Sequence, residues 1–218
     1  MEIKFRNTNP NFTSKIKFVS GKDFDSRMFR EFFYCGKPDE KFGESFCKGH
    51  DIWTPEVRTC SAGGVVDKNC VLAFHLMDKP ENIENVKKEF VKTITGSLNE
   101  AKSALLLGAK KLKQRQNSVP LFEKLKVEVK KITTPSIFET HKNKYAETNI
   151  GYESYTDTWF INTTYPKNTK NLDDRKDVVT LEELLASFEH IKIAPQDKLF
   201  IGNKEIKPKN CPEIFNIS

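Results

Sequence analysis

The chain has 218 residues, of which 37% are hydrophobic and 30% charged, and its formal net charge is +6 at neutral pH. This length and composition exclude a disordered chain and suffice to bury a continuous core, and no stretch approaches the roughly twenty apolar residues of a membrane-spanning helix. Because no apolar run of signal-peptide length follows Met1, we expect a cytoplasmic protein or an effector delivered into a host cytosol by a dedicated machine.

The distribution of charge and the number of cysteines indicate which kind of partner the protein binds and whether its thiols are reduced. Twelve basic residues stand against four acidic ones between Lys87 and Lys131, which suits an acidic protein partner. Aromatic residues do not interleave with these lysines as base stacking requires, so nucleic-acid binding is disfavoured. The five cysteines are odd in number and irregularly spaced, which indicates reduced thiols and not a disulfide framework. We expect a monomer.

The first predicted elements are short. Residues 2–6 and 15–19 alternate in polarity around a turn-rich stretch, which predicts a hairpin. Residues 23–34 contain many aromatic side chains and predict either a short helix or a buried strand. Residues 35–51 are rich in Gly, Lys, Glu and Pro and predict a loop that leads into a second hairpin.

The second hairpin holds the candidate chemistry. Two strands joined around Asp67-Lys68-Asn69 bring residues about fifteen apart into register, which places His75 beside Cys60. Thr54 stands six residues before Cys60. A nucleophilic thiol needs a base that ionises it and a third polar group that positions the pair. The segment therefore predicts Cys60 as nucleophile, His75 as base and acid, and Thr54 as auxiliary residue.

Neighbouring residues extend this candidate site. Arg58 and the backbone donors of Ser61 to Gly64 are predicted to lower the thiol pKa and stabilise an oxyanion, and Gly63 and Gly64 to leave room for a substrate chain. Cys70 is five residues from His75 and is predicted to face the opposite side, in the core.

The second half of the chain predicts helices packed on a sheet. Residues 80–112 have apolar side chains three or four apart and predict one kinked helix or two consecutive helices, with a capping box at Asp78 and Glu81. Residues 125–129 and 155–165 predict strands, and 167–177 a loop. A capping box at Thr180 and Glu183 predicts a helix with an apolar face that runs to residue 191. Gly202-Asn203 predicts a hairpin turn within residues 199–206.

The order of elements gives the fold class and domains. We expect an α/β (α+β) sandwich with helices against a mixed or antiparallel sheet. Residues 1–177 are predicted to form the main domain, and 178–218 a helix-and-hairpin appendage packed on the same core.

Two alternatives remain open from the residues alone. Cys60 and His75 can each be an ordinary buried structural residue. A zinc-binding interaction module is the other, because thiolate and imidazole ligands occur in one loop-rich stretch, at Cys35, Cys47, His50 and Cys60.

The pattern of Thr54, Cys60 and His75 resembles the CheD and cytotoxic-necrotizing-factor family of protein glutamine deamidases. The resemblance covers residues 54 to 112, where an apolar segment ending Leu105-Leu106-Leu107-Gly108-Ala109 follows the hairpin as an expected helix. It implies that Cys60 attacks the side-chain carboxamide of a Gln in a partner protein, and that water then hydrolyses the thioester to leave Glu. No cofactor and no metal are needed. It also implies a divergent toxin or effector, while transglutaminase and thiol peptidase chemistry would use the same thioester.

Overall fold

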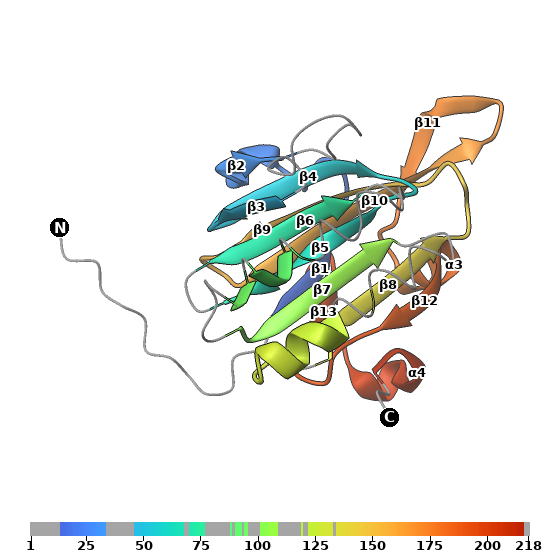
Figure 1. Cartoon of the computed structure of the whole chain (residues 1–218). Coiled ribbons are helices and arrows are strands. Elements are labelled where there is room, and N and C mark those ends of the chain that lie inside the picture. Colours follow the sequence, from blue (N-terminus) through green and yellow to red (C-terminus); the bar gives the residue numbers. More distant parts are fainter. Residues whose placement is uncertain are drawn as a thin grey trace.

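Two mixed β-sheets stacked face to face make up most of the computed structural model (Figure 1). It describes residues 14–33, 46–67, 70–76, 88, 90–92, 94–95, 101–108, 119, 122–132 and 134–215. The first sheet has the order β14-β13-β1-β10-β9-β4-β2, with β11 paired to β10, and the second has the order β12-β8-β7-β5-β6-β3. This arrangement confirms the α+β fold class.

The first sheet contains β1 (Lys15–Phe18), β2 (Glu31–Phe32), β4 (Asp51–Val57), β9 (Glu147–Glu153), β10 (Thr158–Asn168), β11 (Asn171–Asp177), β13 (Lys198–Ile201) and β14 (Lys204–Ile206). The second contains β3 (Phe46–Gly49), β5 (Ser61–Val66), β6 (Val71–Leu76), β7 (Ser103–Gly108), β8 (Ser136–His141) and β12 (Phe188–Lys192). Within the described residues, four helices have defined bounds: η1 (Ser26–Met28), α3 (Leu181–Ser187), η3 (Pro208–Asn210) and α4 (Pro212–Phe215).

The central strands of the second sheet are buried on both faces. Side chains that alternate along β5, β6 and β7 enter two different clusters. One cluster lies between the sheets and includes Ala62, Val66, Ala73, Leu105 and Leu107. The other lies on the outer face, against helical residues of 88–95 and 122–128, and includes Val65, Leu72, Phe74, Leu106, Phe90 and Phe122. Each face is therefore sealed, which leaves only the strand ends of this sheet to approach solvent.

Burial on both faces explains the main error of the sequence prediction. Residues 80–112 were predicted to be helical throughout, but Ser103–Gly108 form β7, and residues 105–108 pair in parallel with β8. A strand covered on both faces has a continuous apolar run instead of an alternating one, and such a run also fits a helix. The prediction is right for the helical residues within 88–95, while the capping box at Asp78 and Glu81 lies outside the described residues.

Residues 122–128 are helical, so the strand predicted at 125–129 is wrong. Phe122, Leu125 and Val129 are buried at helical spacing against the outer cluster, whereas Val127 is 76% exposed. The alternation that suggested a strand was too short to outweigh this longer period.

Several later elements match the prediction. Strand β10 covers most of 155–165, and Thr180 and Glu183 form the predicted capping box of α3. The β13–β14 hairpin turns at Gly202, whose φ of 56° suits glycine. Two boundaries were wrong, because β11 occupies most of the loop predicted at 167–177, and α3 ends at Ser187 before β12.

The C-terminal segment is built into both sheets. Strand β12 pairs with β8 in the second sheet, and β13 pairs in parallel with β1 in the first. Residues 178–218, expected as an appendage, also contribute buried side chains to the shared core, at Val178, Leu184, Phe188, Ile191, Leu199, Ile201, Ile206 and Ile214. The sandwich therefore includes this segment as an integral part.

Near the N-terminus, β1 lies between β10 and β13, each paired with it in parallel. The hairpin partner predicted at residues 2–6 lies outside the described residues. Residues 23–34 form the short 3-10 helix η1 and the two-residue strand β2, not the single helix or strand expected. Within the described part of the chain, no helix is long and apolar enough to cross a membrane.

Candidate functional site

Thr54 and His75 meet across the space between the two sheets. Thr54 lies on β4 of the first sheet and His75 near the end of β6 of the second, and Thr54 Oγ1 is 2.7 Å from His75 Nδ1. Both side chains are buried, with 2% and 1% exposure. A buried hydrogen bond of this kind holds the ring orientation of the imidazole, and because a threonine hydroxyl both donates and accepts, either ring tautomer can make it.

Cys60 lies on the same face of the second sheet as His75. The hairpin register pairs Ala62 with His75, and Cys60 precedes Ala62 by two residues, so alternation directs both side chains to the same side. Cys60 packs against the cluster between the sheets, which independently gives the same direction. Diagonal neighbours in such a pair are about 7–8 Å apart, a distance that an aromatic side chain such as the His75 imidazole can span. The half-buried Cys60 therefore lies on the His75 side of the sheet, just before β5 begins.

A bulge in β4 accounts for the position of Thr54. The register between β4 and β9 shifts between Thr54 and Val57, and Glu56 adopts a positive φ of 57°. Pro55 within this shift cannot donate a ladder hydrogen bond, and proline inside a sheet is largely confined to edges and bulges. The bulge sits immediately after the residue that holds His75.

Arg58 lies at the rim of this site. Its guanidinium contacts Glu147 with Nη2–Oε2 at 2.7 Å and Nε–Oε2 at 3.0 Å, and Arg175 approaches the same carboxylate at 3.5 Å. The Arg58 side chain is 53% exposed, so the pair contributes little to stability. Glu147, which the sequence analysis missed, connects the segment before Cys60 to the start of β9.

Gly63 and Gly64 do not line the site, which corrects their predicted role near the substrate. Both are buried in the middle of β5, between β6 and β7. A Cβ on Gly63 would lie 1.9 Å from the Leu105 carbonyl oxygen, and one on Gly64 2.7 Å from that of Leu72. Glycine is needed there for close strand packing. Ser61 begins β5 and its side chain is buried, so of the predicted oxyanion group only it adjoins Cys60.

Gly108 is a site residue that the sequence analysis did not identify. It pairs with Ser61, has a φ of 100°, and an added Cβ would lie 2.1 Å from the carbonyl oxygen of Cys60. Only a glycine permits the Cys60 backbone to approach the end of β7 this closely. This contact between Cys60 and Gly108 is made by strands that are not consecutive in the chain. The only feature of the sequence that pointed to it was a glycine at the end of an apolar run.

Gly108→Ala is therefore expected to displace Cys60. Strain and the clash should lower the free energy of unfolding by about 1–3 kcal/mol, and should reduce any activity that depends on Cys60 by tenfold or more, on the order of what a misplaced reactive group costs. Gly202→Ala is the matched control, since its φ is 56° and nothing lies within 4 Å of an added Cβ. Urea unfolding and single-turnover rates compare the two. Equal activity in both variants would contradict this role of Gly108.

The other described thiols lie in unreactive surroundings. Burial, followed by the hydrogen bond from Cys47 Sγ to Glu31, raises the pKa of Cys47 to about 12. Burial is also the main cause that raises the pKa of Cys70 and raises that of Cys211 to about 11. Cys70 packs against the outer cluster, on the side opposite His75, as predicted. A protonated thiol is a poor nucleophile and a poor metal ligand.

The zinc alternative gains no support from the described residues. Cys47 is on β3 with its thiol bonded to Glu31, and Cys60 packs between the sheets. No group of three or more His, Cys, Asp or Glu side chains that could hold a metal ion occurs among the residues described. Cys35 lies outside them.

A second imidazole–hydroxyl pair occupies the same end of the sandwich. His141 Nε2 lies 2.9 Å from Thr148 Oγ1, and Thr148 Oγ1 lies 2.9 Å from Thr163 Oγ1. The His141 ring also packs on Phe188, with centroids 4.7 Å apart. Thr148 pairs with Val57 across β9 and β4, close to the bulge after Thr54.

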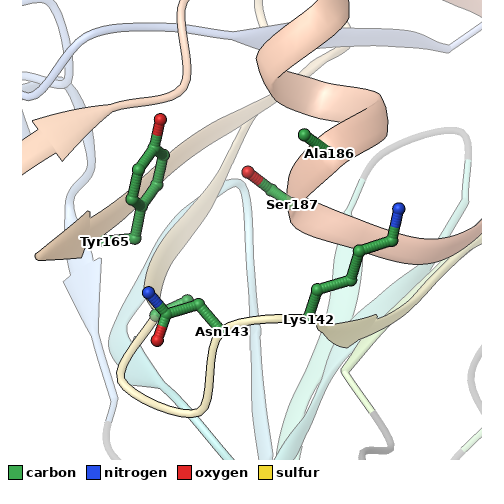
Figure 2. Close-up of a pocket in the computed structure, with 6 residues that line it drawn as sticks. Lys142, Asn143, Tyr165, Ala186 and Ser187 are labelled. Carbon is green, nitrogen blue, oxygen red and sulfur yellow. The ribbon is translucent and has the colours of Figure 1, made fainter. Parts of the chain in front are cut away.

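A surface pocket of about 350 Å³ opens at this end as well (Figure 2). Its lining comes from the turn after β8, the end of β10 and the last residues of α3, and comprises Lys142, Asn143, Ala146, Tyr165, Ala186 and Ser187. None of these residues was singled out from the sequence, because three distant segments meet only in the fold.

Comparisons with known proteins add no family. No protein-family model matches the chain, and no curated protein matches it in sequence.

Proposed function

We propose that this protein is a cysteine-dependent hydrolase that converts a glutamine side chain of a target protein into glutamate. The observation that supports it most is the 2.7 Å contact between Thr54 Oγ1 and His75 Nδ1, with Cys60 on the same face beside His75. The proposal assigns Cys60 as nucleophile, His75 as base and Thr54 as orienting group, with Thr54 six residues before Cys60 and His75 fifteen after it. A purely structural role for His75 would not explain why a partly exposed thiol lies on the same side of the sheet.

In the proposed reaction, Thr54 Oγ1 accepts a hydrogen bond from the Nδ1–H group of His75, so that Nε2 is the basic nitrogen of His75. His75 takes the Cys60 thiol proton, and the thiolate attacks the Gln carboxamide carbon. The C–N bond then breaks as the imidazolium gives this proton to the leaving ammonia. Water attacks the resulting thioester with His75 as base, which releases Glu and restores the thiol.

The proposed substrate is a protein with an acidic surface, since the chain carries net charge +6. The product gains a negative charge at one side chain, which suits a regulatory switch in a target. Action as a toxin or effector in a host cytosol is part of this proposal, and so is action as an endogenous cytosolic enzyme.

The test compares wild-type protein and Cys60→Ser after incubation with a cell lysate. Peptide mass spectrometry should find Gln sites converted to Glu only with wild type, while spontaneous Asn deamidation should be equal in both samples. An added primary amine attached to the same Gln would instead indicate a transglutaminase, and new peptide termini a peptidase. Identical peptide populations from wild type and Cys60→Ser would refute the proposal.

A further inference from the structure

The pocket in Figure 2 presents hydrogen-bond donors to a ligand. Asn143 Oδ1 accepts a hydrogen bond from the Tyr145 backbone N–H at 2.9 Å, and the side-chain NH₂ group of Asn143 can donate to a ligand. Lys142 Nζ donates to the Leu185 carbonyl at 2.9 Å, which uses one of its three N–H donors. Ser187 donates its hydroxyl proton to the Glu183 carbonyl at 2.7 Å.

Charge at the pocket is also positive. Lys142 brings a full charge to the lining, and Lys176 pairs with Tyr165 across β10 and β11. Lys176 and Glu183 form an ion pair and offset one another, so Lys142 supplies the net positive charge at the pocket. Ala146, Ala186 and the Tyr165 ring provide apolar wall for a short aliphatic stem. Donors and a cation around an apolar entrance fit a carboxylate on a methylene chain.

The pocket and Cys60 lie at the same end of the sandwich. Ser61 on β5 pairs with Gly108 on β7, and Gly108 pairs with Glu139 on β8. Cys60, which immediately precedes β5, is therefore level with the end of β8, just before Lys142. In Figure 1 the arrowheads of β7 and β8 point to the side where α3 and the β10–β11 hairpin lie. Two strand spacings and two residues of strand give a separation of about 12 Å, which an extended peptide crosses in roughly four residues.

The Arg58–Glu147–Arg175 ion pairs connect these two places. Arg175 Nη1 donates to the Tyr145 carbonyl at 3.2 Å and to Thr164 Oγ1 at 3.3 Å, next to Ala146 and Tyr165 of the pocket lining. A peptide laid from Cys60 to the pocket would therefore follow a rim of arginine side chains, which favours an acidic chain.

We propose that this pocket binds an Asp or Glu side chain of the protein substrate, roughly four residues from the Gln that Cys60 attacks. The inference rests on the proposed function for the identity of the ligand, but its binding chemistry is independent of Cys60.

The first test measures binding in the catalytically inert Cys60→Ser protein. N-acetyl-glutamate amide, titrated at millimolar concentrations into the ¹⁵N-labelled protein, should shift the backbone amides of the pocket lining. N-acetyl-glutamine amide should not. Lys142→Gln should weaken acid binding about tenfold or more, because a charge-assisted hydrogen bond is lost. Lys144→Gln, which removes the same charge from a lysine over the Tyr145 ring outside the lining, should leave it unchanged.

A second variant tests the pocket without changing Lys142, in case the Lys142→Gln substitution itself disturbs the local structure. Ala186→Glu adds a carboxylate at the exposed rim without altering the lysine, and it should abolish binding of the acid probe. Equal shifts from the glutamine probe, equally tight binding of inorganic phosphate, or shifts away from the pocket would overturn the assignment.

The third test uses peptides from a digested proteome as substrates. Sites with Cys60-dependent conversion of Gln should be enriched in Asp or Glu roughly four residues away, and Lys142→Gln should lose this enrichment. Conversion without any acidic preference would overturn the pocket assignment alone. Pocket binding without any Cys60-dependent conversion would overturn the proposed function and, with it, the identification of the ligand as a substrate side chain.

Discussion

Replacing His75 with Gln is expected to lower both Cys60 alkylation and glutamine hydrolysis at neutral pH by ~10²–10⁴-fold, the range for loss of a general base. Gln retains a hydrogen-bonding group near Thr54 but cannot accept the thiol proton. Rates of iodoacetamide labelling, followed by peptide mass spectrometry, measure the thiolate directly and need no known substrate.

The remaining cysteines provide the internal reference for this labelling. The pKa values of Cys47 and Cys211 are raised to about 12 and about 11, and that of Cys70 is also raised, all mainly by burial. These thiols should react slowly in wild type and in the variant alike. Labelling of Cys60 no faster than that of Cys211 in wild type would argue strongly against an activated nucleophile.

The two imidazole–hydroxyl pairs supply a matched control. Thr54→Val and Thr148→Val each delete one buried hydroxyl bonded to a histidine, at 2.7 and 2.9 Å. Both should cost about 1–3 kcal/mol of stability. Only Thr54→Val should also slow Cys60 labelling, and the pH dependence of that rate should shift, because the orientation of His75 is lost. Similar rates in both variants would make Thr54 purely structural.

The second large effect is expected at the opposite end of the sandwich, where Asp197 is 6% exposed. The pKa of Asp197 is raised to about 7, mainly by burial and also by the nearby Asp157, while the hydrogen bond from Ser136 at 2.6 Å opposes the rise. The folded protein therefore holds a proton that the unfolded chain releases at lower pH. This contribution to stability is complete below about pH 4 and is lost as the pH rises to about 7.

Asp197→Asn should remove this loss, since the amide is uncharged and can still accept from Ser136. Relative to wild type, its free energy of unfolding should increase between about pH 4 and about pH 7 and then level off, with a gain of roughly 4 kcal/mol for a shift of this size. Urea denaturation at several pH values measures the difference. Asp173→Asn, at an exposed position on β11, is the control and should give a flat difference. A flat difference for Asp197→Asn would show that its carboxylate is ionised in the folded protein.

Local signals in the sequence were enough for the parts of the fold that depend on neighbouring residues. The β5–β6 hairpin follows from two apolar runs on either side of a polar turn, so the pairing of β5 with the strand that holds His75 could be predicted. The capping box of α3 and the turn at Gly202 were equally local. Strand β7 could not be distinguished from a helix, because burial on both faces removes the period that separates the two.

Site residues contributed by distant strands could not be found in this way. Gly108 matters because its missing side chain admits the Cys60 carbonyl, and Glu147 because it reaches Arg58 from β9. The pocket at Lys142 depends on α3 and β10 arriving at one turn. These contacts depend on the order of the strands within the sheets, which no short sequence pattern specifies.

The pairing of Lys15 in β1 with Lys198 in β13 has a consequence for how the molecule assembles. Such contacts between remote parts of the chain make folding slow, since a long loop must close before they form. During synthesis, the Cys60 hairpin emerges early, but the strands that complete both layers come last. The two sheets should therefore close only after β12 and β13 have been synthesised and can pair with β8 and β1.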